Sequence, residues 1–128
     1  MKVVAIIVAA GSGKRIGHLR KKQFLSISSK PILAYTLDVF ESIDRVDRII
    51  LVIPRGWKRY CRKEIIQKYG YRKEIEVVSG GARRQDSVAC GLAAVPSDCE
   101  IAIIHDGVRP FVTRRKVVES IVKARKFG

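Results

Sequence analysis

Three short segments of the sequence combine glycine with charged side chains. They are A-A-G-S-G-K-R at 9–15, S-G-G-A-R-R-Q-D-S at 79–87 and H-D-G-V-R-P at 105–110. Glycine lets backbone N–H groups approach phosphate oxygens, and adjacent lysine and arginine side chains neutralise their charge. A carboxylate such as Asp106 is a hard oxygen ligand of the kind that magnesium prefers. These residue types indicate a site for a phosphorylated ligand and a divalent cation.

The first segment departs from the two common glycine-rich nucleotide motifs. The run G-S-G-K at 11–14 lacks the four-residue spacer of a Walker A loop and has Arg15 where serine or threonine would bind magnesium. It is also a poor dinucleotide fingerprint, because the third glycine is Gly17 and the downstream acid, Asp38, falls in a predicted helix. The segment fits a general polyphosphate site, with an ordinary strand-to-turn connection as the alternative.

The third segment has two interpretations. Asp106 directly follows a hydrophobic run, which places a carboxylate where it can hold a magnesium ion that bridges phosphates. Alternatively, Asp106 caps the turn before Pro110 and forms an ion pair with Arg109. We predict that His105 is a packing residue at the end of a strand. A Ser/His/Asp hydrolase is not indicated, because no serine occupies a G-x-S-x-G elbow.

The hydrophobic pattern places these segments after strands. Runs rich in β-branched residues predict strands buried on both faces at 3–8, 49–53, 75–78 and 101–104. Helical periodicity predicts helices at 33–40, 57–69, 88–95 and 117–122, the last after a cap at Thr113. Alternating strands and helices predict a Rossmann-like α/β fold, an open and mostly parallel sheet with helices on both faces. The carboxyl ends of such strands share one edge, so the three segments should surround one cleft.

The chain shows no repeat, no linker and no break in composition, so we interpret residues 1–128 as a single nucleotide-binding domain. The longest uncharged runs have eleven residues, well short of the ~20 that cross a bilayer. The N-terminus lacks a signal-peptide pattern, and we therefore expect a cytoplasmic protein without a membrane partner. Three cysteines without a C-x-x-C pair predict packing thiols rather than disulfides or a zinc site.

Charge is the most informative feature of the composition. The chain has 26 Lys and Arg against 12 Asp and Glu, a net charge of +14, which predicts an anionic partner. The basic stretch at 55–73 carries Trp57, Cys61 and Ile65 at helical spacing, so we interpret its charges as the solvated face of a helix. A basic nucleic-acid-binding domain is the rival class, but the chain lacks aromatic interleaving, an RNP-like run and a helix-turn-helix pattern.

Five segments occur in one order through the whole chain. They are A-A-G-S-G-K-R at 9–15, K-Q-F-L at 22–25, K-P-I-L at 30–33, G-G-A-R-R-Q-D-S-V at 80–88 and H-D-G-V-R-P-F at 105–111. In combination they resemble the 2-C-methyl-D-erythritol 4-phosphate cytidylyltransferases of the non-mevalonate isoprenoid pathway, whose fold is of the nucleotidyltransferase type. Ribitol-5-phosphate cytidylyltransferases share the second and fifth segments and remain the alternative. Ala10 and the run R-Q-D-S-V favour the isoprenoid enzyme.

The resemblance implies a transferase that moves CMP from CTP to a polyol phosphate, 2-C-methyl-D-erythritol 4-phosphate, and releases pyrophosphate. Arg15 and Lys22 would be catalytic and stabilise the transition state. Asp106 would hold Mg²⁺, and Arg109 would support its loop. The residues implied to bind the nucleotide are Ala9, Ala10, Gly11, Ser12, Gly13, Gly81, Ala82, Arg84, Ser87 and Asp106.

The chain departs from the family pattern at three points. Lys21 stands where the family usually has proline, and Ala82 stands where many members have an acid, so a base contact there would come from the backbone. Family members are also considerably longer, and their later part carries the arm that forms the homodimer and completes the acceptor site. We therefore expect this segment to contain the CTP site without completing turnover alone.

Overall fold

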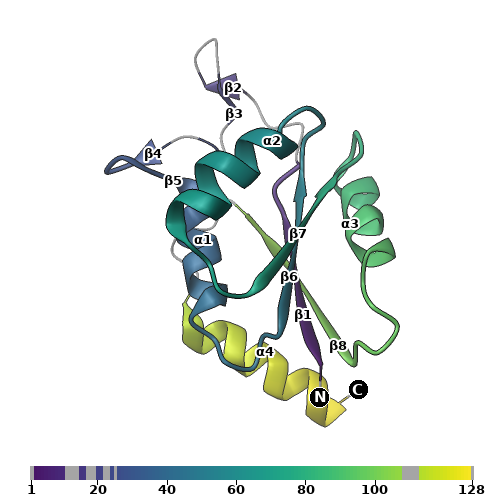
Figure 1. Cartoon of the computed structure of the whole chain (residues 1–128). Helices are drawn as coiled ribbons and strands as arrows, with labels where there is room; N and C mark the ends of the chain where they lie inside the picture. Colours follow the sequence, from purple (N-terminus) through teal and green to yellow (C-terminus); the bar gives the residue numbers. More distant parts are fainter. Residues whose placement is uncertain are drawn as a thin grey trace.

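Two runs of β-branched residues form the centre of a four-stranded parallel sheet (Figure 1). The computed structural model describes residues 2–10, 15–16, 20–21, 24, 26–107 and 113–127. The strand order is β7-β6-β1-β8. The strands are β1 (Val3–Val8), β6 (Arg48–Ile53), β7 (Glu74–Ser79) and β8 (Ile101–Asp106). Every residue of β1 is buried, as is every residue of β6 after Arg48, because both strands lie between neighbours and under helices.

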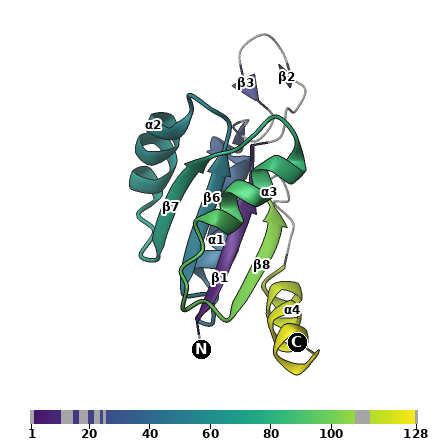
Figure 2. The ribbon, with the colours of Figure 1, turned by 90° about the vertical axis from the view of Figure 1, so that its right-hand side faces the viewer.

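Helices cover both faces of the sheet, as predicted (Figure 2). They are α1 (Ile32–Glu41), α2 (Lys58–Cys61) with its π-helical continuation η2 (Arg62–Gln67), α3 (Arg84–Ala93) and α4 (Arg114–Phe127). The predicted cap of α4 is confirmed, because Thr113 Oγ1 accepts a hydrogen bond from Lys116 N at 3.2 Å. The Rossmann-like fold is therefore confirmed.

The core has two parts, one on each face of the sheet. The larger one contains Leu37 and Phe40 of α1, Ile65 of η2 and Ile121 of α4, all packed on the inward side chains of β1 and β6. The smaller one lies under α3. Here the absence of a side chain at Gly91 permits close approach, since a Cβ would lie 2.6 Å from Ile6 Cγ2. Close packing of α3 fixes where its first turn meets the sheet edge.

The two outer strands correct one prediction. We expected 75–78 and 101–104 to be buried on both faces, but Ala102 and Ile104 of β8 are exposed on one face. The reason is that β7 and β8 are the edges of the described sheet, and continuous apolar runs are typical of central strands. Leu92, expected on the buried face of its helix, is 46% exposed, and Val95 follows the end of α3.

Four two-residue strands were not predicted. They are β2 (Arg15–Ile16) with β3 (Arg20–Lys21), and β4 (Ser26–Ile27) with β5 (Lys30–Pro31), each an antiparallel pair. Ser28 and Ser29, which join β4 to β5, have φ of 52° and 68°. Tight hairpin turns with positive φ usually carry Asn-Gly or Asp-Gly, so the sequence lacked the usual turn signal here.

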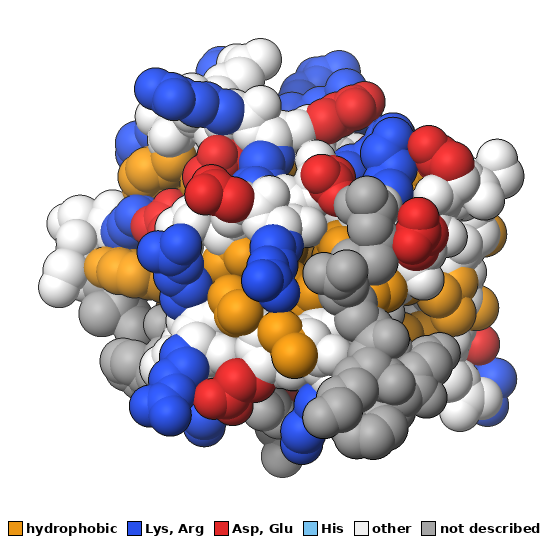
Figure 3. All heavy atoms as spheres, turned by 90° about the horizontal axis from the view of Figure 1, so that it is seen from below, with side chains coloured by type: hydrophobic (Ala, Val, Ile, Leu, Met, Phe, Trp, Pro, Cys, Tyr) orange, Lys and Arg blue, Asp and Glu red, His pale blue; other side chains and the backbone are white. Residues whose placement is uncertain are grey.

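Acidic and basic side chains are interspersed at the end of the molecule that carries the amino ends of the strands (Figure 3). Lys2 pairs with Asp98 at 3.2 Å, and Arg48 pairs with Glu76 at 2.7 Å. Within the described part of the chain, no helix is long and apolar enough to span a bilayer. The opposite end of the sheet is where the three glycine-containing segments begin.

Candidate functional site

The three segments begin at one edge of the sheet, at the carboxyl ends of the strands. Backbone hydrogen bonds between neighbouring chain segments continue one residue beyond the strands. The bonds are Ala9 N to Val52 O (2.7 Å), Gly80 N to Ile53 O (2.8 Å) and Gly107 N to Val8 O (2.9 Å). Each donor is the small residue that immediately follows β1, β7 or β8. The loops after β1, β7 and β8 therefore start side by side, as predicted for a parallel sheet.

Two glycines allow these loops to touch. A Cβ at Gly80 would lie 2.5 Å from Ala10 Cβ and 2.5 Å from Ser87 Oγ. A Cβ at Gly107 would lie 2.8 Å from Ala9 Cβ. No side chain fits at these distances, so glycine is required for the backbones to approach. Ala9 and Ala10 are consequently buried between the loops that follow β7 and β8.

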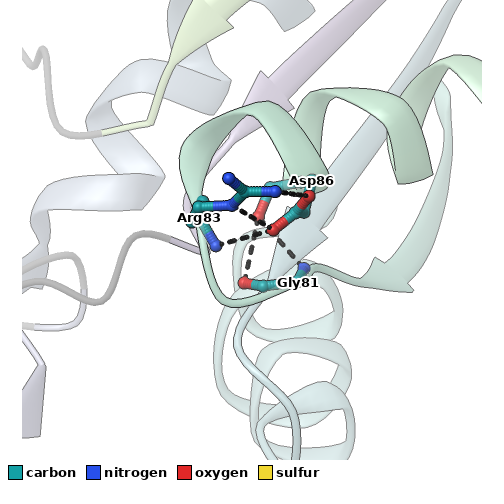
Figure 4. Close-up of polar contacts among 4 residues, drawn as sticks. Gly81, Arg83 and Asp86 are labelled. Atoms are coloured by element: carbon teal, nitrogen blue, oxygen red, sulfur yellow. Dashed lines mark hydrogen bonds and ion pairs between the residues drawn. The ribbon is translucent and has the colours of Figure 1, made fainter.

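The loop after β7 is shaped by the first turn of α3. Ser87 is fully buried, and its Oγ accepts a hydrogen bond from Gly81 N at 3.2 Å. Asp86 Oδ2 accepts from both Arg83 N at 3.2 Å and Arg83 Nε at 3.1 Å (Figure 4). A carboxylate three residues into a helix that binds the preceding backbone N–H is a common way to fix a helix start. These bonds hold Gly81 against the beginning of α3.

An ion pair links the second and third segments. Arg84 Nε and Nη2 each lie 3.4 Å from Asp106 Oδ1. Asp106 is the last residue of β8, where it pairs with Val8, so the strand runs two residues further than predicted. The alternative partner from the sequence, Arg109, lies outside the described residues. The pair places one carboxylate and one guanidinium at the shared edge.

Sequence reasoning missed Thr36 of α1. Its side chain is fully buried, and its Oγ1 donates a hydrogen bond to Gly107 O at 3.0 Å. Thr36 thereby ties the loop after Asp106 to a helix from another part of the chain. A threonine next to Leu33 and Leu37 on the buried face of a predicted helix was the available signal, because a buried hydroxyl requires a partner.

Six of the predicted site residues come together at this edge: Ala9, Ala10, Gly81, Arg84, Ser87 and Asp106. Ala82 lies exposed in the same loop as Gly81. Arg15 begins β2, but its side chain is not described. The remaining predicted residues lie outside the described part of the chain: Gly11, Ser12, Gly13, Lys22 and Arg109.

Two side chains near the site have packing roles. His105 is half-buried, and its ring meets that of Phe40 edge-on at 5.4 Å, which confirms the predicted packing role. Burial raises the pKa of the Cys61 thiol to about 12, so this cysteine is not a nucleophile at neutral pH. Among the described residues, no three His, Cys, Asp or Glu side chains are grouped closely enough to hold a metal by themselves.

The sequence model of one protein family, 2-C-methyl-D-erythritol 4-phosphate cytidylyltransferase, matches residues 3–127. The chain belongs to this family. The cytidylyltransferase of Alkaliphilus metalliredigens is 45% identical over 127 residues, and that of Clostridium botulinum Loch Maree is 48% identical over 123 residues. These alignments cover 99% and 96% of this chain but 53% of each relative. The chain thus spans about half the length of these cytidylyltransferases.

Solved structures agree with this family assignment. The 4-diphosphocytidyl-2C-methyl-D-erythritol synthase of Anaerococcus prevotii superposes with a TM-score of 0.83 at 32% identity, over 98% of this chain and 52% of that one. A CMP:2-keto-3-deoxy-manno-octonic acid synthetase solved with CTP superposes with a TM-score of 0.73 at 18% identity, over 99% of this chain and 48% of that one. The second likeness shows the fold alone.

Proposed function

We propose that this chain contains the CTP site of an enzyme that transfers CMP from CTP to 2-C-methyl-D-erythritol 4-phosphate and releases pyrophosphate. The observation that carries the proposal is the meeting of three loops at one sheet edge, where Arg84 and Asp106 face each other at 3.4 Å. Glycine backbone, a cation and a carboxylate are the groups that a nucleoside triphosphate with magnesium requires. The family description points to cytosine as the nucleobase and to 2-C-methyl-D-erythritol 4-phosphate as the acceptor.

The chemistry is a displacement at the α-phosphorus of CTP. A phosphate oxygen of the acceptor forms a new P–O bond to this atom, and the bond from the α-phosphorus to the bridging oxygen of pyrophosphate breaks. Because the acceptor phosphate is already an anion, the reaction requires no general base. The difficulty is electrostatic, since one anion approaches another, and oriented cations supply most of the catalysis. Arg15 and Lys22 are the residues that we assign to this task.

The described residues fit a magnesium ion at Asp106. Its carboxylate lies at the carboxyl end of β8, and its side chain is one-third exposed to solvent. Magnesium is commonly held by one or two carboxylates together with substrate phosphates and water, so a single aspartate is sufficient. Held by Asp106, the ion would neutralise negative charge on the bound phosphates. Arg84, already beside Asp106, adds a second positive charge to the same edge.

Selection of cytosine is assigned to the tight part of the site. Ala10 and Ser87 are buried against Gly80, and Ala9 is buried against Gly107. We assign to this closely packed part of the site the preference for a pyrimidine over a purine. Backbone groups of Gly81 and Ala82 would recognise the base edge, with Ser87 holding Gly81 in place. Gly11, Ser12 and Gly13 would wrap the triphosphate, and Arg109 would support the loop of Asp106.

The wider assignments follow from the same proposal. Residues 1–128 form one nucleotide-binding domain, the reaction takes place in the cytoplasm, and the protein of family length works as a homodimer. The acceptor is methylerythritol phosphate rather than ribitol 5-phosphate, because the matched family and the named relatives carry the former substrate in their names.

The proposal is tested by Lys22→Ala in a protein of family length that carries this sequence. Turnover, followed as pyrophosphate release, should fall by about a hundredfold or more, because the contact of Lys22 strengthens in the transition state. The dissociation constant for CTP should rise by less than about fivefold. Lys21→Ala removes the neighbouring lysine and is the matched control. Equal losses in turnover and binding would mean that Lys22 merely binds substrate, and no release by the unmutated protein would overturn the function.

A further inference from the structure

The outer face of α2 and η2 carries an open groove lined by basic side chains. It has a volume of about 590 Å³ and is lined by Lys58, Arg59, Arg62, Lys63 and Gln67, all of them exposed. Small-molecule sites in proteins commonly have volumes of about 300–1,000 Å³. The sequence predicted a solvated helix face here, and the exposure of these side chains confirms that prediction. We call these five residues the basic groove.

The opposite face of the same helix is fixed to the core. Cys61 of α2 and Ile65 of η2 are fully buried in the larger part of the core, on the β7 side of the sheet (Figure 2). Trp57, which directly precedes α2, stacks on the buried ring of Phe24 with centroids 4.5 Å apart. The helix is therefore held in one orientation, and the basic groove faces solvent.

Positive charge in the basic groove is not balanced by acidic side chains. Glu64 is the one acid in the stretch 55–73, and it does not line the groove. Among the described residues, no carboxylate forms an ion pair with any of the four cations. Lys58 and Arg62 are four residues apart, as are the other two cations, and like charges at this spacing destabilise a helix. A bound anion would remove this repulsion.

The basic groove coincides with an uncommon backbone geometry. Residues 62–67 form η2, a π-helical stretch that continues α2. Such turns are rare inside α-helices and occur frequently at functional sites. Because a π-turn closes hydrogen bonds between residues five apart, Arg62 and Gln67 come to the same side of the helix, and both line the groove. This geometry is a second feature, independent of charge, that indicates binding at this face.

We propose that the basic groove binds a small anion with adjacent phosphate groups, at residues that the CTP site does not use. The two arginines offer paired N–H donors that match phosphate oxygens, the two lysines add point charges, and the amide of Gln67 adds a neutral donor. A single phosphate group carries about two negative charges at neutral pH, so adjacent phosphates match four cations better. This inference does not depend on the proposed function.

Two larger anionic partners fit the basic groove less well. Proteins that bind single-stranded nucleic acid offer aromatic rings on which bases stack. Trp57 and Tyr60, which flank the first two cations, are instead packed on each other and on Phe24. A helix that binds a membrane surface inserts apolar side chains, whereas those of α2 and η2 pack in the core. A small phosphate chain requires neither feature.

The first test locates the bound anion and does not require activity. Inorganic triphosphate should shift the backbone amide resonances of residues 58–67 in NMR spectra of the chain. Inorganic phosphate should bind there at least about tenfold more weakly, because it offers less charge to the four cations. Asp106→Ala should leave the shifts at 58–67 unchanged. Failure of triphosphate to shift these resonances, or loss of the shifts in Asp106→Ala, would overturn the proposal.

The second test separates the basic groove from the net charge of the chain. Combining Arg59→Gln with Arg62→Gln should raise the dissociation constant for triphosphate at 58–67 by about tenfold or more. Arg114→Gln with Arg115→Gln is the matched control, because it removes two exposed arginines from the helix α4. The control should change the constant by less than about threefold, since distant exposed charges are screened. Equal losses in the two double variants would contradict a site in the groove.

The third test compares triphosphate with the two larger partners. The probes are a single-stranded oligonucleotide of about ten nucleotides and vesicles that contain phosphatidylserine. We expect half-maximal shifts at 58–67 to require at least as much oligonucleotide phosphate as triphosphate phosphate. We also expect vesicle binding to be the same in the two double variants. Tighter binding of the oligonucleotide per phosphate would replace the small anion by nucleic acid, and vesicle binding that depends on Arg59 and Arg62 would replace it by a membrane surface.

Discussion

The guanidinium of Arg84 and the carboxylate of Asp106 lie 3.4 Å apart across the edge of the sheet. Arg84 belongs to the first turn of α3 and Asp106 ends β8, so the pair joins a helix start to a strand end 22 residues later in the sequence. The Arg84 side chain is 60% exposed, and such an ion pair contributes little to stability. We propose that its significance is functional, because it places a cation beside the residue that we assign to magnesium.

Arg84→Ala should therefore weaken CTP binding by about threefold to tenfold while leaving the melting temperature nearly unchanged. The loss should shrink at high salt, because the group is exposed and its field is screened. Arg115→Ala on α4, which removes a still more exposed cation paired with Glu119, is the control. If both variants weaken CTP binding equally in titrations, net charge rather than position accounts for the effect.

Thr36→Val tests the attachment of the loop after Asp106. Valine keeps the shape but leaves the carbonyl of Gly107 without the buried donor that it has at 3.0 Å. The free energy of unfolding should fall by about 1–3 kcal/mol in urea denaturation. Thr36→Ser keeps the hydroxyl and should lose less. A Thr36→Val protein as stable as the unmutated one would show that the hydrogen bond contributes nothing.

Gly80→Ala tests the contact between the loops. The new methyl group would lie 2.5 Å from both Ala10 Cβ and Ser87 Oγ, so these groups must move. Gly91→Ala is the matched control, because its methyl group would meet Ile6 in the core, away from the site. Both changes should reduce stability by about 1–3 kcal/mol. Gly80→Ala alone should also weaken CTP binding, and comparable binding by the two variants would contradict the assignment of Ala10 and Ser87.

The Cys61 thiol predicts a pH dependence of stability. Burial raises its pKa from 9.0 to about 12, so the folded state retains the proton more strongly than the unfolded state. The resulting stabilisation is fully present below pH 9 and is lost as the pH rises through the folded pKa. Compared with Cys61→Ala, the unmutated protein should lose up to about 1.4 kcal/mol per pH unit across that range. Parallel curves for the two proteins, measured by denaturant titration, would contradict the burial effect.

Much of the fold could be predicted because the central strands and helix faces have strong periodic patterns. The bounds predicted for the first strand, 3–8, are those of β1. The edge strands could not be distinguished from central ones, since the apolar run at 101–104 contains no signal that one of its faces is left uncovered. The hairpin around Ser28 and Ser29 lacked the residues that usually mark a turn with positive φ.

The candidate site was predictable to the extent that it follows strand ends. Glycine-containing loops after parallel strands had to meet at one edge, and Ala10, Gly80 and Ser87 do meet. The pairing of Arg84 with Asp106 was not predictable, because it depends on the orientation of α3 over the sheet. The stacking of Phe24 on Trp57 likewise could not be predicted, because the two residues are far apart in the sequence and no sequence pattern indicates their contact.

The central claim is that this chain holds a magnesium-dependent CTP site at Asp106. The most direct measurement is a calorimetric titration of the chain with CTP, with and without magnesium, beside ATP and UTP and repeated with Asp106→Ala. We predict binding that requires magnesium, favours CTP over both other nucleotides and is weakened by the substitution. Failure to bind any nucleotide, or binding that is indifferent to both magnesium and Asp106→Ala, would contradict the claim.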